Sequence, residues 1–303
     1  MYFSDIYTAW KNGKRATLKP ASYSTYVLLA EKYLLPKLKD KETITEADME
    51  AIREEVVKAG GSQKTAKDVS VLLMGILRYG AKEGLCPMPN WQTKAKETTG
   101  PQPITILNLK QEKQLLKQLA EEPNYRNIGI YLALTAGLKQ GEICALTWQD
   151  IDLEHGYIHI RGSQGYIYAV NGEAREWRRK TEAESNAQPR DIPLADEQIA
   201  FLKPIIQGHR PELFVLSNSE TPMHPRTLRQ YLTTLLKKQN LPPVTFRDLR
   251  HTFAVRCLEA GVDFVTLAQL LGNDSVAATV STYQNFVQSR PRKGLQAMLK
   301  RLG

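Results

Sequence analysis

Apolar positions with helical spacing run through the first 95 residues of the chain and predict three helices. The second helix begins at Thr45 and ends at Gly60, where helix-start residues and a glycine pair bound the pattern. The third covers about residues 65–84. The apolar positions that we expect to form a small helical core are Tyr26, Leu29, Tyr33, Leu34 and Leu38 in the first helix, and Val71, Leu72, Ile76 and Leu77 in the third.

Residues 94–104 are polar and include two prolines, so they cannot contribute to a core. We therefore predict a linker at 96–104 between a helical domain at 1–95 and a larger domain at 105–288. Helical periodicity returns at 108–120, at 125–136 and again from Gln140.

The periodicity then changes to the alternation of apolar and polar residues that is typical of strands. Residues 157–161 alternate, and residues 166–170 alternate again before Asn171-Gly172, a strong hairpin-turn pair. Residues 190–194 form a short third strand, and Pro193 marks its end or a sheet edge. Helical patterns follow at 196–207, 226–239, 247–259, 264–271 and 276–286. Gly261 is placed to cap the third of these helices in the left-handed conformation. The fold class is thus mainly α with a small antiparallel β-sheet.

Composition narrows the choice of partner. The 303 residues carry a formal net charge of +9, which favours a polyanion, nucleic acid before an anionic membrane. Cys86, Cys144 and Cys257 lie far apart and suggest neither a disulfide framework nor a zinc site. The first residues lack a signal-peptide pattern, and no apolar run approaches the roughly 20 residues that span a bilayer. We expect a cytoplasmic protein without a membrane partner, metal or cofactor.

Two groups of motifs carry candidate chemistry. Residues 134–146, followed by Trp148–Asp152, form one group; Thr245–Thr252, Leu270–Ser275 and Tyr283 form the other. These motifs and their order resemble the tyrosine recombinase (phage integrase) family, and the resemblance covers nearly the whole chain. It implies a two-domain tyrosine recombinase architecture: a helical core-binding domain, an α+β catalytic domain, and a C-terminal helix at 289–303 that docks on a neighbouring protomer.

The resemblance also implies roles for single residues. Tyr283 is the expected nucleophile, and Arg250 is expected to bind the scissile phosphate through both ends of its guanidinium. The alternative for Arg250 is a surface ion pair with Asp248. Lys180, on the turn before the third strand, is the expected general acid for the leaving 5′ oxygen. Its alternatives are a solvated charge run, or a shift of the role to Arg178 or Arg179.

Three catalytic positions depart from the family pattern. Lys139 stands where the family has its first arginine, and losing one of two charge-assisted bonds costs roughly 1.5–3 kcal/mol, or about ten- to a hundredfold in rate. Arg247 occupies a position that is usually histidine, and Asn273 one that is usually histidine or tryptophan. Arginine cannot exchange protons near neutral pH. Glu142 matches the residue that supports the first motif. His251 could partly replace the missing histidine, but we do not assign it as a base.

The resemblance implies site-specific DNA recombination, as in the integration and excision of a mobile element. The partners would be double-stranded DNA, three further copies of the chain in a homo-tetramer, and accessory DNA-bending factors. The candidate DNA-binding residues are Lys14, Arg15, Lys64, Lys67, Arg178, Arg179 and Arg226. Because three catalytic positions are substituted, the chain could also be a natural slow enzyme, an engineered recombinase, or a DNA-binding protein that does not cut. A type IB topoisomerase is a weaker alternative.

Overall fold

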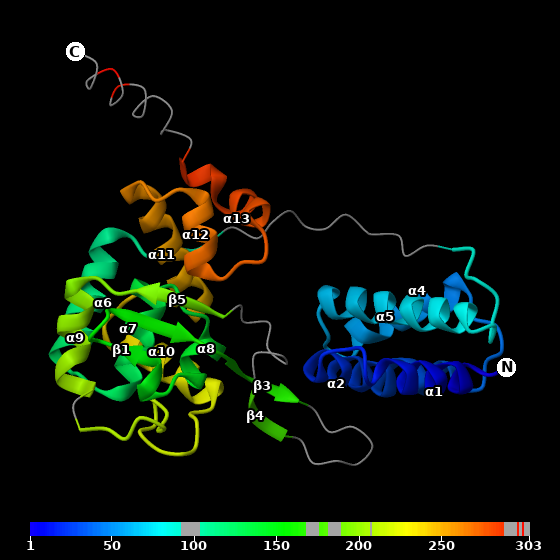
Figure 1. The fold of residues 1–303 in the computed structure, drawn as a ribbon. Helices are drawn as coiled ribbons and strands as arrows, with labels where there is room; N and C mark the ends of the chain where they lie inside the picture. The colour runs from blue at the N-terminus through cyan, green and yellow to red at the C-terminus, as the bar shows by residue number, and fades with distance from the viewer. Residues whose placement is uncertain are drawn as a thin grey trace. The chain divides into compact units, whose positions relative to one another are not determined.

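The computed structural model describes residues 1–91, 104–167, 176–180, 189–206 and 208–287, together with Gln296 and Leu299. The chain divides into two compact units (Figure 1): Met1–Gln102 with Tyr166–Arg178, and Pro103–Gly165 with Arg179–Gly303. The predicted linker, apart from Ile104, the Asn171-Gly172 turn and most of the C-terminal helix lie outside the described residues.

The first unit is helical in its described part. Its helices are α1 (Phe3–Lys14), α2 (Pro20–Leu29), the π-helix η1 (Ala30–Leu34), α3 (Leu35–Leu38), α4 (Glu46–Lys58) and α5 (Gln63–Lys82). Thr45 caps α4 as expected, because its hydroxyl accepts a hydrogen bond from the amide of Asp48 at 3.3 Å. Helix α1 was not among the predicted helices, and it buries its apolar face against α5.

The buried face of the segment that follows α1 differs from the predicted stripe. Tyr26 is exposed and Leu29 is only partly buried, whereas Tyr23, Val27 and Ala30 are buried together with Leu34 and Leu38. The π-helix η1 adds one residue to a helical turn. The buried face after η1 is therefore rotated relative to the buried face before it. Val71 is also exposed in α5, since Val69, Leu72 and Leu73 face the core instead.

The second unit combines helices with a small sheet. Its described helices are α6 (Leu109–Glu121), α7 (Tyr125–Thr135), α8 (Gln140–Ala145), η2 (Trp148–Asp150), α9 (Asp196–Ile206), α10 (Pro225–Lys238), α11 (Phe246–Ala260), α12 (Phe264–Leu271), α13 (Val276–Tyr283) and η3 (Gln284–Val287). Its strands include β1 (Ile151–Asp152), β2 (Tyr157–Ile160) and β5 (Arg190–Pro193). Gly261 ends α11 with φ +106°, which confirms the predicted left-handed cap.

The three-stranded sheet has the order β1-β2-β5, and both pairings are antiparallel. Ile158 pairs with Ile192 across β2 and β5, and both side chains are buried in the core. A separate two-stranded sheet joins β3 (Ser163–Ile167) and β4 (Glu176–Lys180). The expected small antiparallel sheet is therefore confirmed. However, β3 begins earlier than predicted, and β4 is a strand that alternation did not reveal.

Helix α7 forms the centre of the second unit. It contacts α6, α8, α9, α10 and α11. Residues 127–134 are all buried, so α7 lacks a solvent face over that stretch. Gly129 permits this crowding, because a Cβ atom there would lie 2.9 Å from both Ile143 and Leu216. No helix in the described part of the chain is long and apolar enough to cross a bilayer.

A buried ion pair joins α8, β5 and the end of α12. The carboxylate of Glu142 accepts hydrogen bonds from both terminal nitrogens of Arg190, at 3.0 and 2.9 Å, and both side chains are almost fully buried. The Nε of Arg190 also donates to the carbonyl of Leu270 at 2.8 Å. Gly272 ends α12 with φ +57°, and a Cβ there would lie 2.7 Å from Arg190, so a larger residue would displace the guanidinium.

Replacing Arg190 with methionine should lower the free energy of unfolding by roughly 3–5 kcal/mol, because the buried Glu142 carboxylate would lose its two charge-assisted hydrogen bonds to Arg190. Urea unfolding followed by circular dichroism measures the loss. Arg210→Met is the matched control, since Arg210 forms exposed ion pairs with Glu212 and Glu220 and its loss should leave stability unchanged. Equal effects of the two substitutions would contradict this role of the buried pair.

The same ion pair should make stability depend on pH. Burial alone would raise the pKa of Glu142, but the hydrogen bonds and charge of Arg190 outweigh burial and lower the pKa below the usual 4.5. The stabilisation is therefore complete above pH 4.5 and is lost as pH falls through the lowered native pKa. Urea unfolding between pH 3 and 6 should show a shallower acid loss for Glu142→Gln than for the unaltered chain. Parallel curves would refute the assignment.

Candidate active site

A pocket of about 450 Å³ opens between α8, α10 and α11. Four of its seven lining residues are positively charged, and none is acidic. The lining residues are Lys139, Gln140, Arg229, Thr245, Phe246, Arg247 and Arg250. A cavity with this lining is suited to an anion with several oxygens, such as a phosphate group.

Arg250 is held rigidly at this pocket. It donates to the carbonyls of Gly137 and Leu271, each at 2.6 Å, and to the side-chain oxygen of Asn273 at 3.0 Å. Asp248 instead accepts a bond from the amide of Thr245 at 2.7 Å, within the cap of α11. The alternative of a surface ion pair between Arg250 and Asp248 is therefore wrong. Burial lowers the pKa of Arg250 to about 10, so the guanidinium remains charged at neutral pH.

Lys139 lies at the start of α8 and also borders the pocket. Its backbone amide donates to Glu142 at 2.9 Å, and its ammonium donates to the carbonyl of Gly272 at 3.2 Å. Burial lowers the pKa of Lys139, with the charges of Arg250 and Arg190 acting in the same direction, while Glu142 opposes them. Glu142 thus contacts the motif that it was predicted to support.

Asn273 approaches Arg250 but does not line the pocket. Its side-chain nitrogen donates to the hydroxyl of Thr279 at 2.9 Å, while its oxygen accepts from Arg250. Asn273 therefore links Arg250 to α13, and its contacts are with protein groups rather than with the open volume.

Tyr283 is the last residue of α13 and is 3% exposed. Its hydroxyl oxygen lies 2.7 Å from Nδ1 of His251, and the two rings meet edge to face. Burial raises the pKa of Tyr283, whereas the charges of Arg250 and Arg247 lower it. Arg247 in turn donates from Nε to Nε2 of His251 at 3.1 Å. The structure thus brings Tyr283, His251, Arg247, Arg250 and Lys139 together.

The other predicted residues lie elsewhere or have undescribed side chains. Arg178, Arg179 and Lys180 belong to β4 by their backbone, and Lys180 is the last residue of this strand rather than part of a turn. Their side chains lie outside the described part of the structure. Arg226 is exposed on the first turn of α10 and is not among the residues that line the pocket.

In the first unit, the predicted DNA-binding residues lie at the end of α1 and the start of α5. Lys14 lies over the ring of Tyr79, with 5.6 Å between the ammonium and the ring centroid. Arg15, Lys64 and Lys67 are exposed.

Three residues of the site were not identified from the sequence. The sequence pattern places Arg190 only at the start of a strand, whereas in the structure its guanidinium binds Glu142. Arg229 contributes a charge to the pocket, and its spacing of three from Arg226 on an amphipathic helix was the available signal. Gln140 donates from its side chain to the carbonyl of Pro225 at 2.7 Å and so ties α8 to the start of α10.

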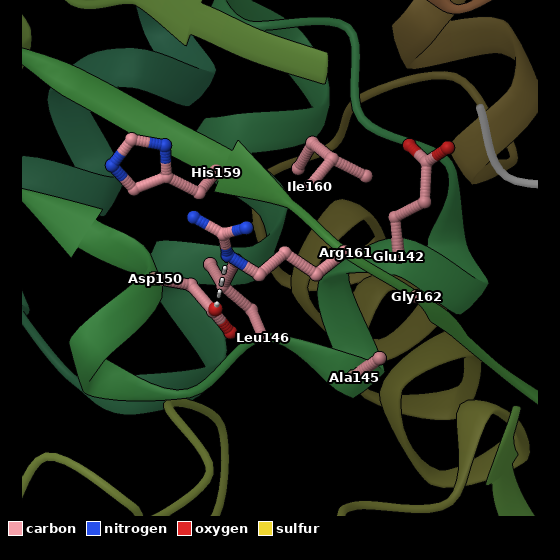
Figure 2. A pocket seen from close by; sticks show the side chains of 8 residues that line it. All are labelled: Glu142, Ala145, Leu146, Asp150, His159, Ile160, Arg161 and Gly162. Carbon is pink, nitrogen blue, oxygen red and sulfur yellow. Dashed lines mark ion pairs between the residues drawn. The ribbon is translucent and has the colours of Figure 1, made fainter. Parts of the chain in front are cut away.

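A second, narrow pocket is lined by Glu142 together with residues of α8, η2 and β2 (Figure 2). Arg161 points toward Asp150 there, with 3.9 Å between Nε and Oδ1. Asp150 also accepts hydrogen bonds from the amide and hydroxyl of Thr147, at 2.9 and 2.7 Å. These hydrogen bonds hold η2 in place after α8, so we assign Asp150 and Thr147 a structural role. Within the described residues, no group of three histidine, cysteine or acidic side chains could hold a metal ion.

Comparison with known proteins places this geometry in a family. Residues 105–290 match the phage integrase family. A tyrosine recombinase of Thermosipho africanus is 26% identical over 50% of this chain and 46% of its own length. Tyrosine recombinase XerA of Pyrococcus furiosus is 24% identical over 70% of this chain and 68% of its own length. The first of these alignments therefore spans less than half of the relative.

Solved structures share the fold. The Tn1549 transposon integrase in complex with transposon right-end DNA has a TM-score of 0.73 at 19% identity, over 100% of this chain and 99% of that chain. A lambda integrase dimer bound to a COC′ core site has a TM-score of 0.61 at 18% identity, over 93% of this chain and 77% of that chain. With a family match over more than half of its length and the two motif groups meeting at one cationic pocket, the chain belongs to the phage integrase family of tyrosine recombinases.

Proposed function

We propose that this chain catalyses site-specific DNA recombination, with Tyr283 as the nucleophile. The observation that carries the proposal is the link, through Arg247, between a cationic pocket without acidic lining residues and the buried pair of Tyr283 and His251. The relatives support it, since two are tyrosine recombinases and the solved neighbours are integrases bound to DNA.

In the proposed reaction, the oxygen of Tyr283 attacks a phosphorus atom of the DNA backbone. A 3′-phosphotyrosyl bond forms, and the bond to the 5′ oxygen breaks. Arg250, Arg247 and Lys139 stabilise the charge on the non-bridging oxygens. Asn273 holds Arg250 in place, and Lys180 protonates the leaving oxygen. A 5′ hydroxyl from the partner strand then attacks the phosphotyrosyl bond and rejoins the DNA.

The substrate that we propose is a mobile element. ICEBs1 integrase of Bacillus subtilis, 17% identical over 91% of this chain and 76% of its own length, supports this assignment together with the Tn1549 transposon integrase. We further propose that four protomers act on two duplexes, that the tail at 289–303 docks on a neighbouring protomer, and that accessory factors bend the DNA. The predicted DNA-binding residues would contact DNA phosphates, as the net charge of +9 favours; they are Lys14, Arg15, Lys64, Lys67, Arg178, Arg179 and Arg226.

The second candidate function is DNA binding without cleavage. It is favoured by the three substituted positions, because Lys139 lacks the planar fork of arginine and Arg247 cannot exchange a proton. Binding would then persist while the covalent step fails. An experiment that separates the two functions must therefore detect the bond to Tyr283 itself.

Covalent attachment to DNA should depend on Tyr283. Duplexes that the protein selects from a random-sequence library would be nicked at successive positions and incubated with the chain and with Tyr283→Phe. We expect a denaturation-resistant adduct with the unaltered chain and none with the variant. Mass spectrometry of the digested adduct should place the nucleotide on the peptide that contains Tyr283.

The triple variant Lys139→Arg, Arg247→His and Asn273→His serves as the reference for the substituted positions. An adduct with this variant alone would establish the second candidate function for the unaltered chain. Bound DNA without an adduct in either protein would overturn the assignment of Tyr283 as nucleophile.

Arg229→Ala should weaken DNA binding, because Arg229 would contact a phosphate from the pocket wall. Removing one phosphate contact should reduce the magnitude of the slope of log K against log salt by about 0.9. Fluorescence anisotropy with a selected duplex at several salt concentrations measures this slope. Arg210→Ala is the control on an exposed arginine outside the pocket, and an identical slope for both variants would exclude Arg229 from the interface.

A further inference from the structure

A chain of hydrogen bonds runs from the phosphate pocket to the buried nucleophile. Arg247 lines the pocket, and its Nε lies 3.1 Å from Nε2 of His251. The opposite ring nitrogen, Nδ1, lies 2.7 Å from the hydroxyl oxygen of Tyr283. His251 is 8% exposed, so both ring nitrogens meet protein groups rather than bulk water.

The direction of these bonds follows from the chemistry of the donors. A guanidinium has only N–H donors and cannot accept, so Nε2 of His251 must be the acceptor and carry no proton. A neutral imidazole holds one proton, which must then be on Nδ1. Consequently Nδ1–H donates to the oxygen of Tyr283, and His251 has no free lone pair that could take the phenol proton.

The surroundings of His251 keep its ring neutral. Burial lowers the pKa of His251, and the charges of Arg247 and Arg250 lower it further, whereas Asp248 acts in the opposite direction. These three groups lie on α11, and Tyr283 faces the ring from the end of α13. An imidazolium would carry a proton on Nε2, directed at the guanidinium of Arg247, which like-charge repulsion disfavours.

We propose that Arg247 is a positioning residue that fixes the Nδ1–H tautomer of His251, and that His251 thereby holds the Tyr283 oxygen for attack instead of serving as its base. In the reaction the phenol proton is released to solvent and is not taken up by His251. The Tyr283 oxygen bonds to phosphorus, the bond between phosphorus and the 5′ oxygen breaks, and the 5′ oxygen gains a proton from Lys180, as in the proposed function. Charge that develops on the phenol oxygen is stabilised by Nδ1–H.

This assignment deepens the proposed recombinase function and rests on it for the covalent step. It also gives arginine at position 247 a specific use. The Nε of Arg247 contacts His251, which leaves its two terminal nitrogens to bind a phosphate oxygen in the pocket. One side chain would therefore connect phosphate binding with the orientation of the nucleophile.

The tautomer can be measured without DNA. Long-range ¹H–¹⁵N correlation spectra of the ¹⁵N-histidine-labelled chain at pH 7 report which ring nitrogen carries the proton. Loss of signals in His251→Gln identifies His251 among the five histidines. We expect a protonated Nδ1 in the unaltered chain. Protonation of Nε2 in that chain would overturn the proposal.

Two variants of Arg247 isolate its role. Glutamine places an amide nitrogen at the position of Nε, and methionine fills the same space without a donor. We expect Arg247→Gln to keep the Nδ1–H tautomer and Arg247→Met to move the proton to Nε2. The same tautomer in both variants would show that Arg247 does not set it. Unchanged signals of His155, His159, His209 and His224 report that each variant is folded.

The rate of covalent adduct formation on the selected nicked duplex gives the functional readout. Both variants lose the charge at the phosphate, so their difference reports the donor alone. At pH 7 we expect Arg247→Met to react roughly two- to tenfold more slowly than Arg247→Gln, since one hydrogen bond to the phenol oxygen is lost. The difference in rate between Arg247→Met and Arg247→Gln should become smaller as pH rises toward the pKa of Tyr283.

Identical rates and pH profiles would contradict the positioning role. Absence of an adduct in every form of the chain would instead contradict the proposed recombinase function, and the tautomer spectra would still decide the assignment of Arg247 and His251.

Discussion

The arrangement of the site depends on one buried carboxylate. Glu142 accepts two hydrogen bonds from Arg190 and one from the amide of Lys139, while the ammonium of Lys139 lies 3.7 Å from Oε1. Positively charged groups that are crowded and partly buried repel one another, and a single anion beneath them offsets that repulsion. Glu142 can fill this role because Arg190 keeps it ionised despite burial. The pocket above remains free of acidic side chains, and its positive potential is available to a ligand.

Backbone dipoles complete the support of the cations. Arg250 donates to the carbonyl of Gly137, just beyond the end of α7, and to the carbonyl of Leu271, the last residue of α12. Carbonyls at the C-terminal end of a helix carry partial negative charge. The guanidinium is thus held by two helix ends rather than by a carboxylate, which would neutralise it. This arrangement fixes the orientation of Arg250 before any phosphate arrives.

Features that depend on local sequence could be predicted, and features that depend on contacts between distant segments could not. The cap at Thr45 and the left-handed conformation of Gly261 each depend on the sequence of a few neighbouring residues, and the sequence predicted both. The positions of Lys139 and Arg250 followed from motifs. In contrast, the partnership of Glu142 with Arg190 joins residues 48 apart, and that of His251 with Tyr283 joins residues 32 apart. The π-turn at Ala30–Leu34 shifted a buried face by a rotation that a regular helical period cannot express.

Gly272 and Asn273, although adjacent, constrain their side chains in different ways. The left-handed backbone of Gly272 and its closeness to Arg190 exclude any side chain, whereas Asn273 beside it uses only its side chain to reach Arg250 and Thr279. A substitution at Gly272 would therefore disturb the backbone and Arg190, whereas one at Asn273 would remove two side-chain hydrogen bonds. Positions 139, 247 and 273 can differ in chemistry without a change in the backbone that Gly272 shapes. Stability constrains the backbone around the site, whereas the reaction constrains the side chains at 139, 247 and 273.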